Sequence, residues 1–230
     1  MGVLSGLFGK KGDASPPDFP FPLKESTGKQ AASTLRALFA ETKDTGQTPV
    51  LVGDTKDLEK ILQVRGYNQE LPEPEEIIRQ ALAKDPAAWL KERYADEEFE
   101  GMDQTELLGT WPTPPRPETI MRTPRKLLMP GFKKTVYIAL LPTKEAWQAP
   151  AYLRVGGWNE YPDPAMECAV ARMWEEKYGA KYAACLGDTV EFLVDAPPDD
   201  RNAAEELAWE HYNYCPDIVD QGAETICNLA

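Results

Sequence analysis

Six prolines between residues 112 and 130 constrain the fold more than any other feature of the sequence. They are Pro112, Pro114, Pro115, Pro117, Pro124 and Pro130. Because proline fixes its own φ and has no backbone N–H to donate, neither a long helix nor a central strand can cross this stretch. We therefore expect residues 111–130 to form a proline-rich linker between an N-terminal region, residues 27–110, and a C-terminal domain, residues 131–230.

The first residues show little structural periodicity. Residues 12–26 contain glycine and four prolines, which predicts a flexible lead-in over residues 1–26, after which folding begins. At the start, a short apolar run comes before Lys10 and Lys11, whereas a secretory signal places its positive charge first. A frayed terminus is one interpretation of residues 1–11, and weak contact with a membrane or a partner is the other.

The pattern of residues 27–110 predicts a mainly helical region. Apolar residues recur at helical spacing over residues 29–43, 57–66 and 74–93, and an Asp-Pro pair should interrupt the third helix. Between the first and second helices, residues 48–53 form a short apolar run closed by glycine. Such a run is typical of a strand.

The C-terminal domain shows the alternation of strand and helix that is typical of an α/β protein. Residues 134–141 are β-branched and apolar enough for a buried strand, and residues 152–155 are a candidate for another. Residues 164–178 place apolar side chains at three- and four-residue intervals, which predicts a helix. A Gly-Asp turn then predicts a hairpin over residues 181–194. We expect an α/β (α+β) fold, with a mixed sheet and flanking helices in this domain.

Side chains that can cap a helix precede four of the predicted helices. They are Thr27, Asp54 or Thr55, Asp163 before Pro164, and Asp199 or Asp200 before a final helix that ends at Cys215-Pro216. A capping side chain accepts hydrogen bonds from the first free N–H groups of the helix. These residues therefore mark where the four helices should begin.

The segment Gly156-Gly157-Trp158-Asn159 joins a predicted strand to the start of a helix. Two glycines let the backbone adopt a positive φ or approach another group closely, and free N–H groups at the helix start could receive an anion. One interpretation is a binding loop in which Trp158 is a platform and Asn159 a hydrogen-bonding group. The other is a tryptophan-anchored corner that only packs the domain, and nearby acidic residues would oppose a phosphate.

The sole histidine, His211, lies four residues before Cys215 on the last predicted helix, and Asp217 follows closely. A spacing of four places two side chains on one face of a helix. The trio could be a thiol activated by an imidazole, or three metal ligands. No Cys-His enzyme signature and no convincing fourth ligand accompany them, so we expect no metal. They remain candidate binding residues, with a buried structural thiol and histidine as the alternative.

Acidic side chains outnumber basic ones 38 to 25, which gives a net charge of −13. Binding to nucleic acid requires lysine and arginine to replace counterions, so this balance argues against a nucleic-acid partner. It suits a basic protein partner better, with solubility as the alternative explanation. Adjacent acidic residues on helix faces usually face water, although paired carboxylates can also carry out acid–base chemistry or bind calcium.

The chain has four cysteines but no Cys-x-x-Cys pair. We therefore expect reduced thiols and a cytoplasmic protein. No run of about 18 apolar residues is present, so no transmembrane segment is expected. The sequence also lacks the phosphate-loop, nucleophile-elbow, EF-hand and dinucleotide-binding motifs, and we expect no cofactor.

Residues 136–230 combine the Gly-Gly-Trp-Asn segment with a Cys-Pro-Asp segment. Further features are Ala146-Trp147, Pro162, Trp174, Tyr178-Gly179-Ala180, Pro197-Pro198 and Tyr214-Cys215-Pro216-Asp217-Ile218. In these features the chain resembles the bacterial family known as domain of unknown function 4253. The resemblance implies a bacterial protein with an α/β domain, and it brings no established catalytic residues. It does not account for the first 130 residues.

Two hypotheses about function follow. The first is a protein-binding protein, such as an acidic immunity-type or regulatory antagonist of a basic partner. The second is a small-molecule-binding domain or hydrolase-like enzyme whose site lies between the Gly156 to Asn159 loop and the helix end that carries His211, Cys215 and Asp217. The second hypothesis predicts a concave pocket in which the side chains of these two segments converge.

Overall fold

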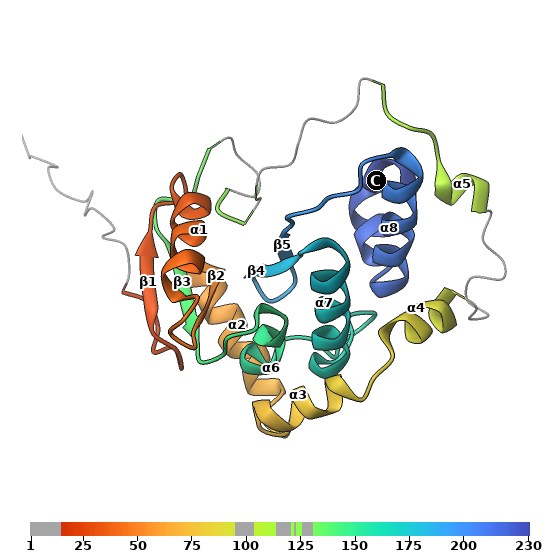
Figure 1. Cartoon of the computed structure of the whole chain (residues 1–230). Helices are drawn as coiled ribbons and strands as arrows, with labels where there is room; N and C mark the ends of the chain where they lie inside the picture. Colours follow the sequence, from red (N-terminus) through yellow and green to blue (C-terminus); the bar gives the residue numbers. More distant parts are fainter. Residues whose placement is uncertain (1–14, 95–103, 114–120, 122, 126–130) are drawn as a thin grey trace, which may run out of the picture.

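The computed structural model describes residues 15–94, 104–113, 121, 123–125 and 131–230. Within these residues a five-stranded mixed sheet carries helices on both faces (Figure 1). The strands are β1 (Leu23–Ser26), β2 (Thr48–Gly53), β3 (Val136–Leu141), β4 (Lys181–Cys185) and β5 (Val190–Leu193). The predicted α/β fold class is confirmed.

The strand order, β1-β3-β2-β4-β5, combines segments from both sides of the proline-rich stretch. β3 lies between β1 and β2 and is antiparallel to both, whereas β2 pairs in parallel with β4 through Leu51 and Ala184. β4 and β5 form an antiparallel hairpin around Gly187-Asp188. The N-terminal region and the C-terminal domain thus contribute to one sheet, with β5 at one edge and β1 at the other.

The period-two alternation of strand residues divides the core between the two faces of the sheet. Leu51 joins the cluster that contains Leu35 of α1 (Ala31–Thr42), on one face, whereas Val50 and Val52 join the cluster that contains Val170 of α7 (Pro164–Tyr178), on the other. The Val170 cluster also draws on α2 (Thr55–Tyr67), α3 (Pro74–Leu82), α4 (Pro86–Tyr94) and α6 (Ala149–Leu153), and it includes Tyr214 at the end of a later helix.

A third apolar cluster holds the C-terminal segments together. The elements concerned are α5 (Gln104–Leu108), α8 (Arg201–Tyr214), a π-helical turn (Val219–Ala223) and α9 (Ile226–Leu229). Tyr212 of α8 packs with Val219 and Ile226, and Leu107 and Leu108 of α5 pack against them. In Figure 1, α8 and α1 lie on opposite sides of the β4–β5 hairpin. In that view α7 lies between the hairpin and α8.

Three of the predicted helix starts are confirmed in detail. Asp54 accepts hydrogen bonds from the N–H groups of Lys56 and Asp57, and the Asp57 carboxylate accepts one from the Asp54 N–H, which completes a capping box. Asp163 caps α7 and Asp200 caps α8 through their carboxylates. Each of these helices begins where a carboxylate receives its first free N–H groups.

Thr27 does not cap the first helix. The residue before α1 is Gln30, whose side chain makes no capping hydrogen bond. The Thr27 hydroxyl instead accepts a hydrogen bond from the Gln30 N–H, over 3.3 Å. The extra turn between Thr27 and Ala31 moves the start of the helix beyond the reach of the threonine side chain.

Two further expectations differ from the structure. The candidate strand over residues 152–155 is wrong, because Ala149–Leu153 form α6 with Pro150 in its first turn and Arg154 as a left-handed C-cap. Regular structure also begins earlier than expected, since Leu23–Ser26 pair with β3. The contact predicted for residues 1–11 and most of the predicted linker lie outside the described residues.

No helix in the described part of the chain is both long and apolar enough to cross a membrane. The longest described helix, α7, has only 15 residues, fewer than the roughly 20 that a bilayer requires.

Candidate functional site

The loop between α6 and α7 is held in an unusual backbone conformation. Arg154, Gly156, Gly157 and Asn159 all have positive φ, at 54°, 115°, 83° and 49°. Two of the four are not glycine, and side chains rarely tolerate this region. The Asn68 side-chain amide donates to the carbonyl oxygens of Arg154 and Gly156, at 2.9 and 3.1 Å. The loop is therefore fixed by specific bonds rather than by its own conformational preference.

Gly156 is required by packing as well as by its backbone angle. A Cβ built on Gly156 would overlap the carbonyl oxygen of Pro162 and would lie 3.5 Å from Oε2 of Glu167. The neighbouring Gly157 has open space around it, with the nearest atom at 3.9 Å, and its N–H donates to the Pro162 carbonyl over 2.9 Å. The two glycines thus have different roles, although the sequence presents them as a pair.

Five aromatic side chains form a continuous row from the loop to the edge of the sheet. In order they are Trp158, Tyr161, Tyr214, Trp174 and Phe192, with successive ring centroids 5.3, 6.0, 5.3 and 5.5 Å apart. Most of these neighbours meet edge to face, the arrangement that aromatic quadrupoles favour. We call this set the aromatic row. It connects the loop, α7, α8 and β5 into one wall.

A buried carboxyl group lies behind the aromatic row. Glu167 of α7 is 1% exposed, and its Oε1 accepts hydrogen bonds from the hydroxyls of Tyr161, at 2.5 Å, and Tyr182, at 2.9 Å. Its Oε2 has no hydrogen-bond partner among the described residues. Burial raises the pKa of Glu167 to about 8, although both tyrosine hydroxyls act to lower it. The group is therefore mainly protonated at neutral pH and anchors the loop through Tyr161.

His211 stands beside the aromatic row at the C-terminal end of α8. Its ring meets Trp174 edge to face, with centroids 4.8 Å apart. Removal of water lowers the pKa of His211 to about 4, and the neighbouring Glu210 only partly opposes this effect. His211 is thus a neutral imidazole at physiological pH, and its role in the wall is that of a polar aromatic ring.

The chemistry of Cys215 does not favour a nucleophile. Its N–H donates to the His211 carbonyl, which ends α8. Burial and then the negative charge of Asp217 raise the pKa of the Cys215 thiol, whereas a reactive cysteine requires a lowered pKa. In the described part of the chain, no three side chains of His, Cys, Asp or Glu are grouped so that they could hold a metal ion.

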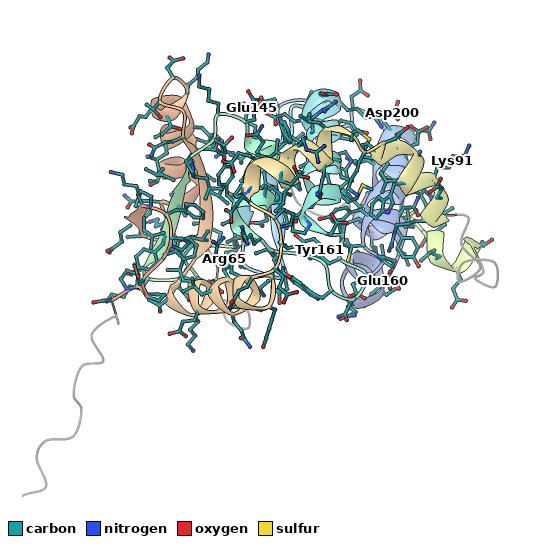
Figure 2. All side chains as sticks on the ribbon, turned by 90° about the horizontal axis from the view of Figure 1, so that it is seen from below. Arg65, Lys91, Glu145, Glu160, Tyr161 and Asp200 are labelled. Carbon is teal, nitrogen blue, oxygen red and sulfur yellow. The ribbon has the colours of Figure 1, made fainter. Side chains whose placement is uncertain are left out.

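Arg93 of α4 ties the loop to α8. Its guanidinium forms an ion pair with Glu160, at 2.7 Å, and donates to the backbone carbonyl of Asn213 over 2.7 Å. Its charged group also lies over the ring of Trp89, 5.2 Å from the centroid. Figure 2 shows the side chains from below, with Glu160 and Tyr161 of this loop labelled. One arginine thus braces the two segments that the sequence analysis singled out.

The aromatic row borders a large open groove. Of the seven predicted site residues, the side chains of Trp158, Asn159, His211, Cys215 and Asp217 line this groove, while Gly156 and Gly157 supply the loop behind it. The groove continues around β5 to α1, where Arg36, Phe39 and Lys43 line it. Its volume is about 1670 Å³, whereas pockets for small molecules usually measure about 300–1,000 Å³. Its dimensions suit an extended molecule.

Sequence reasoning did not assign to the site the residues that organise this wall. These are Arg93, Tyr161, Glu167, Trp174, Phe192 and Tyr214. The sequence contains one indication of the role of Glu167. This residue precedes Val170, Ala171 and Trp174 by three, four and seven residues. That spacing places a carboxyl on the buried face of α7. An acidic residue on such a face predicts a specific hydrogen-bonding partner.

Comparison with known proteins supports the expected family for the C-terminal part. Residues 137–230 match the family model described as domain of unknown function (DUF4253). This match includes the loop, α7, the β4–β5 hairpin and α8, but not β1, β2 or α1. No curated protein and no solved structure matches the chain significantly.

Proposed function

We propose that this protein binds another protein by holding one of its segments in the groove along β5. The observation that carries this proposal is the groove itself, which runs from the α1 side of β5 to the aromatic row and α8. Aromatic side chains are enriched in protein interfaces because they bury a large area with few rotatable bonds. A long, open groove with such a wall is better matched to a polypeptide than to a small ligand.

The charge of the protein supports a basic partner. The net charge of −13 creates a negative field that accelerates the approach of a positively charged protein and disfavours an acidic one. This combination suits an acidic antagonist, of the immunity or regulatory type, that forms a stoichiometric complex with its target.

The rigidity of the wall supports binding further. The loop is fixed by the Asn68 amide, by the Tyr161 hydroxyl on Glu167 and by the Arg93 ion pair with Glu160. A surface that is already ordered loses little conformational entropy when a partner binds. The bonds behind the loop therefore contribute to affinity without contacting the partner.

A ligand-binding or hydrolase-like site is the second candidate. It is favoured by the finding that Trp158, Asn159, His211, Cys215 and Asp217 line the same groove. It requires reactive groups at neutral pH, however, and the pKa of Cys215 is raised while that of His211 is lowered to about 4. These shifts leave a neutral thiol and a neutral imidazole, which suit contact with a ligand better than nucleophilic chemistry.

A peptide-display selection tests the proposed function. A library of random twelve-residue peptides would be selected against the wild-type protein, with Trp158→Ala as the groove variant and Tyr67→Ser as the control. Tyr67 lies on α2, is 75% exposed and does not line the groove. We expect basic peptides that bind wild type and Y67S, bind W158A less, and dissociate as NaCl rises from about 0.05 M to about 0.5 M. Enrichment of acidic peptides, or equal binding to all three proteins, would contradict the proposal.

A further inference from the structure

We infer that the partner segment joins the sheet as an additional strand along the outer edge of β5. This inference rests on the proposed function and specifies its geometry. Among the described residues, β4 is the only strand paired with β5. The edge strand Val190–Leu193 contains neither lysine nor proline, the residues that commonly protect exposed edges from further pairing. Its occupant is a basic segment of a second protein in extended conformation.

The hydrogen-bonding pattern of the hairpin indicates which backbone groups of β5 point away from β4. The Leu186 N–H donates to the Thr189 carbonyl across the two-residue turn, over 2.9 Å. Residues on an antiparallel strand alternate between facing the paired strand and facing away from it. The backbone groups of Thr189 face β4, so the N–H and C=O groups of Val190 and Phe192 point away from it. The same alternation applies to Val194, the residue that follows the strand. An added strand would form its ladder with these groups.

The side chains of β5 indicate what an added strand would meet on each face. Val190 and Phe192 pack toward the cluster that contains Trp174, whereas Leu193 packs toward the α1 cluster. Leu207 and His211 of α8 line the groove on the Phe192 side. A segment with alternating apolar and basic residues could therefore place its apolar side chains against the aromatic row and its basic ones on the opposite face, where Glu191 lines the groove as well as Arg36 and Lys43.

Another part of the chain shows that the α1 side of β5 accepts polypeptide. Met121 is buried in the cluster that contains Leu35, and Leu193 of β5 packs against this cluster. The Thr123 N–H donates to the Glu191 carboxylate over 3.1 Å. In these contacts β5 takes part through side chains, since the Glu191 carboxylate accepts the hydrogen bond and Leu193 packs against the cluster. The net charge of −13 then selects a basic segment over an acidic one.

The test uses synthetic peptides as defined probes. The first is a fluorescein-labelled peptide of alternating lysine and valine, and its matched control replaces every lysine with glutamate. Two further versions carry N-methyl groups on either all valines or all lysines, so that each version blocks one edge of the peptide strand. Binding to the full-length protein would be measured by fluorescence anisotropy.

On the protein, Val194→Pro removes one outward N–H, and Val194→Thr retains it. Val194 is 45% exposed, so neither change disturbs a buried side chain. We expect the lysine peptide to bind, the glutamate peptide to bind at least about tenfold more weakly, and one of the two methylated versions to lose about tenfold or more. V194P should weaken binding while V194T should not. If V194P fails to fold, the methylated peptides still decide the outcome.

The outcomes separate strand addition from the proposed function. If both methylated peptides bind like the parent, the segment is held by side chains alone and the strand is refuted while groove binding stands. If neither the lysine nor the glutamate peptide binds, although display selection yields groove-dependent peptides, the alternating basic segment is the wrong occupant. A sedimentation experiment that shows a dimer of wild type and a monomer of V194P would identify the occupant as a second copy of this chain and overturn the inference.

Discussion

The hydroxyl of Tyr161 donates a 2.5 Å hydrogen bond to Glu167, which is 1% exposed. Tyr161 belongs to the loop that carries Trp158 and Asn159, and its ring also contacts Trp158 and Tyr214. One side chain thus links a buried carboxyl group in α7 to the wall of the groove. The position of the loop should therefore depend on the state of Glu167.

Replacing Glu167 with Gln should change how stability depends on pH. The pKa of Glu167 is about 8 in the folded protein, whereas an unburied glutamate has a pKa of 4.5. A raised carboxyl pKa favours the folded state at low pH, and this contribution is lost as pH rises through about 8. We expect E167Q to match wild type near pH 5 and to be more stable by roughly 3–5 kcal/mol near pH 9. Urea unfolding at both pH values measures this difference. If the free energy of unfolding changes equally with pH in the two proteins, the raised pKa of Glu167 is refuted.

Replacing Tyr161 with Phe should loosen the loop while keeping the ring in the aromatic row. The change removes one donor to a buried acceptor, so we expect a loss of about 1–2 kcal/mol in the free energy of unfolding. Tyr182→Phe is the matched control, because Tyr182 donates to the same oxygen of Glu167 from β4, outside the loop. Amide hydrogen exchange near Trp158 should accelerate in Y161F but not in Y182F. Equal acceleration in both variants would show that the loop does not depend on the Tyr161 bond.

His211 should make the protein less stable as pH falls. Its pKa is lowered from 6.5 to about 4, so between these values the unfolded chain binds a proton that the folded chain does not. Stability should therefore decrease as pH falls from about 6.5 to about 4, by on the order of 1–3 kcal/mol from this residue. In His211→Gln that part of the decrease should disappear. The comparison is made by thermal unfolding across this range, and an unchanged pH profile in H211Q would show that the folded imidazole titrates normally.

The two glycines of the loop should respond differently to alanine. Gly156→Ala places a Cβ into the Pro162 carbonyl at a φ of 115°, and we expect a loss of roughly 2–4 kcal/mol in the free energy of unfolding. Gly157→Ala adds a Cβ to open space at a φ of 83°, so only backbone strain of about 1 kcal/mol is expected. Chemical denaturation of both variants provides the measurement. A larger loss in G157A than in G156A would mean that the loop geometry is wrong.

Local features of the sequence predicted the helices and the hairpin well. The Asp163-Pro164 pair and the apolar spacing that follows specify α7, and Gly187-Asp188 specifies the turn between β4 and β5, because both signals act over a few residues. The strand β1 was missed because Leu-Lys-Glu-Ser has little apolar character and pairs with residues more than a hundred positions later. Its partner is not visible in a local pattern.

The arrangement of the site could be predicted only in part. Helical spacing brings His211 and Cys215 to one end of α8, but no local rule places the Trp158 loop beside that end. Their proximity depends on the packing of α7 against α8 through Trp174 and on the brace provided by Arg93. These contacts join segments far apart in the sequence. The candidate residues were therefore identifiable by type, while the groove that they share was not.

The central claim is that the groove along β5 binds a basic polypeptide segment, and the most direct measurement is NMR mapping with the alternating lysine–valine peptide. The account predicts that added peptide shifts the indole N–H signal of Trp158 and the amide signals of Val190 and Phe192, and that it slows hydrogen exchange at those two amides. Signals on the exposed face of α2, such as the Tyr67 amide, should stay unchanged. Shifts confined to surfaces outside the groove, or no shifts at all with this peptide, would contradict the claim.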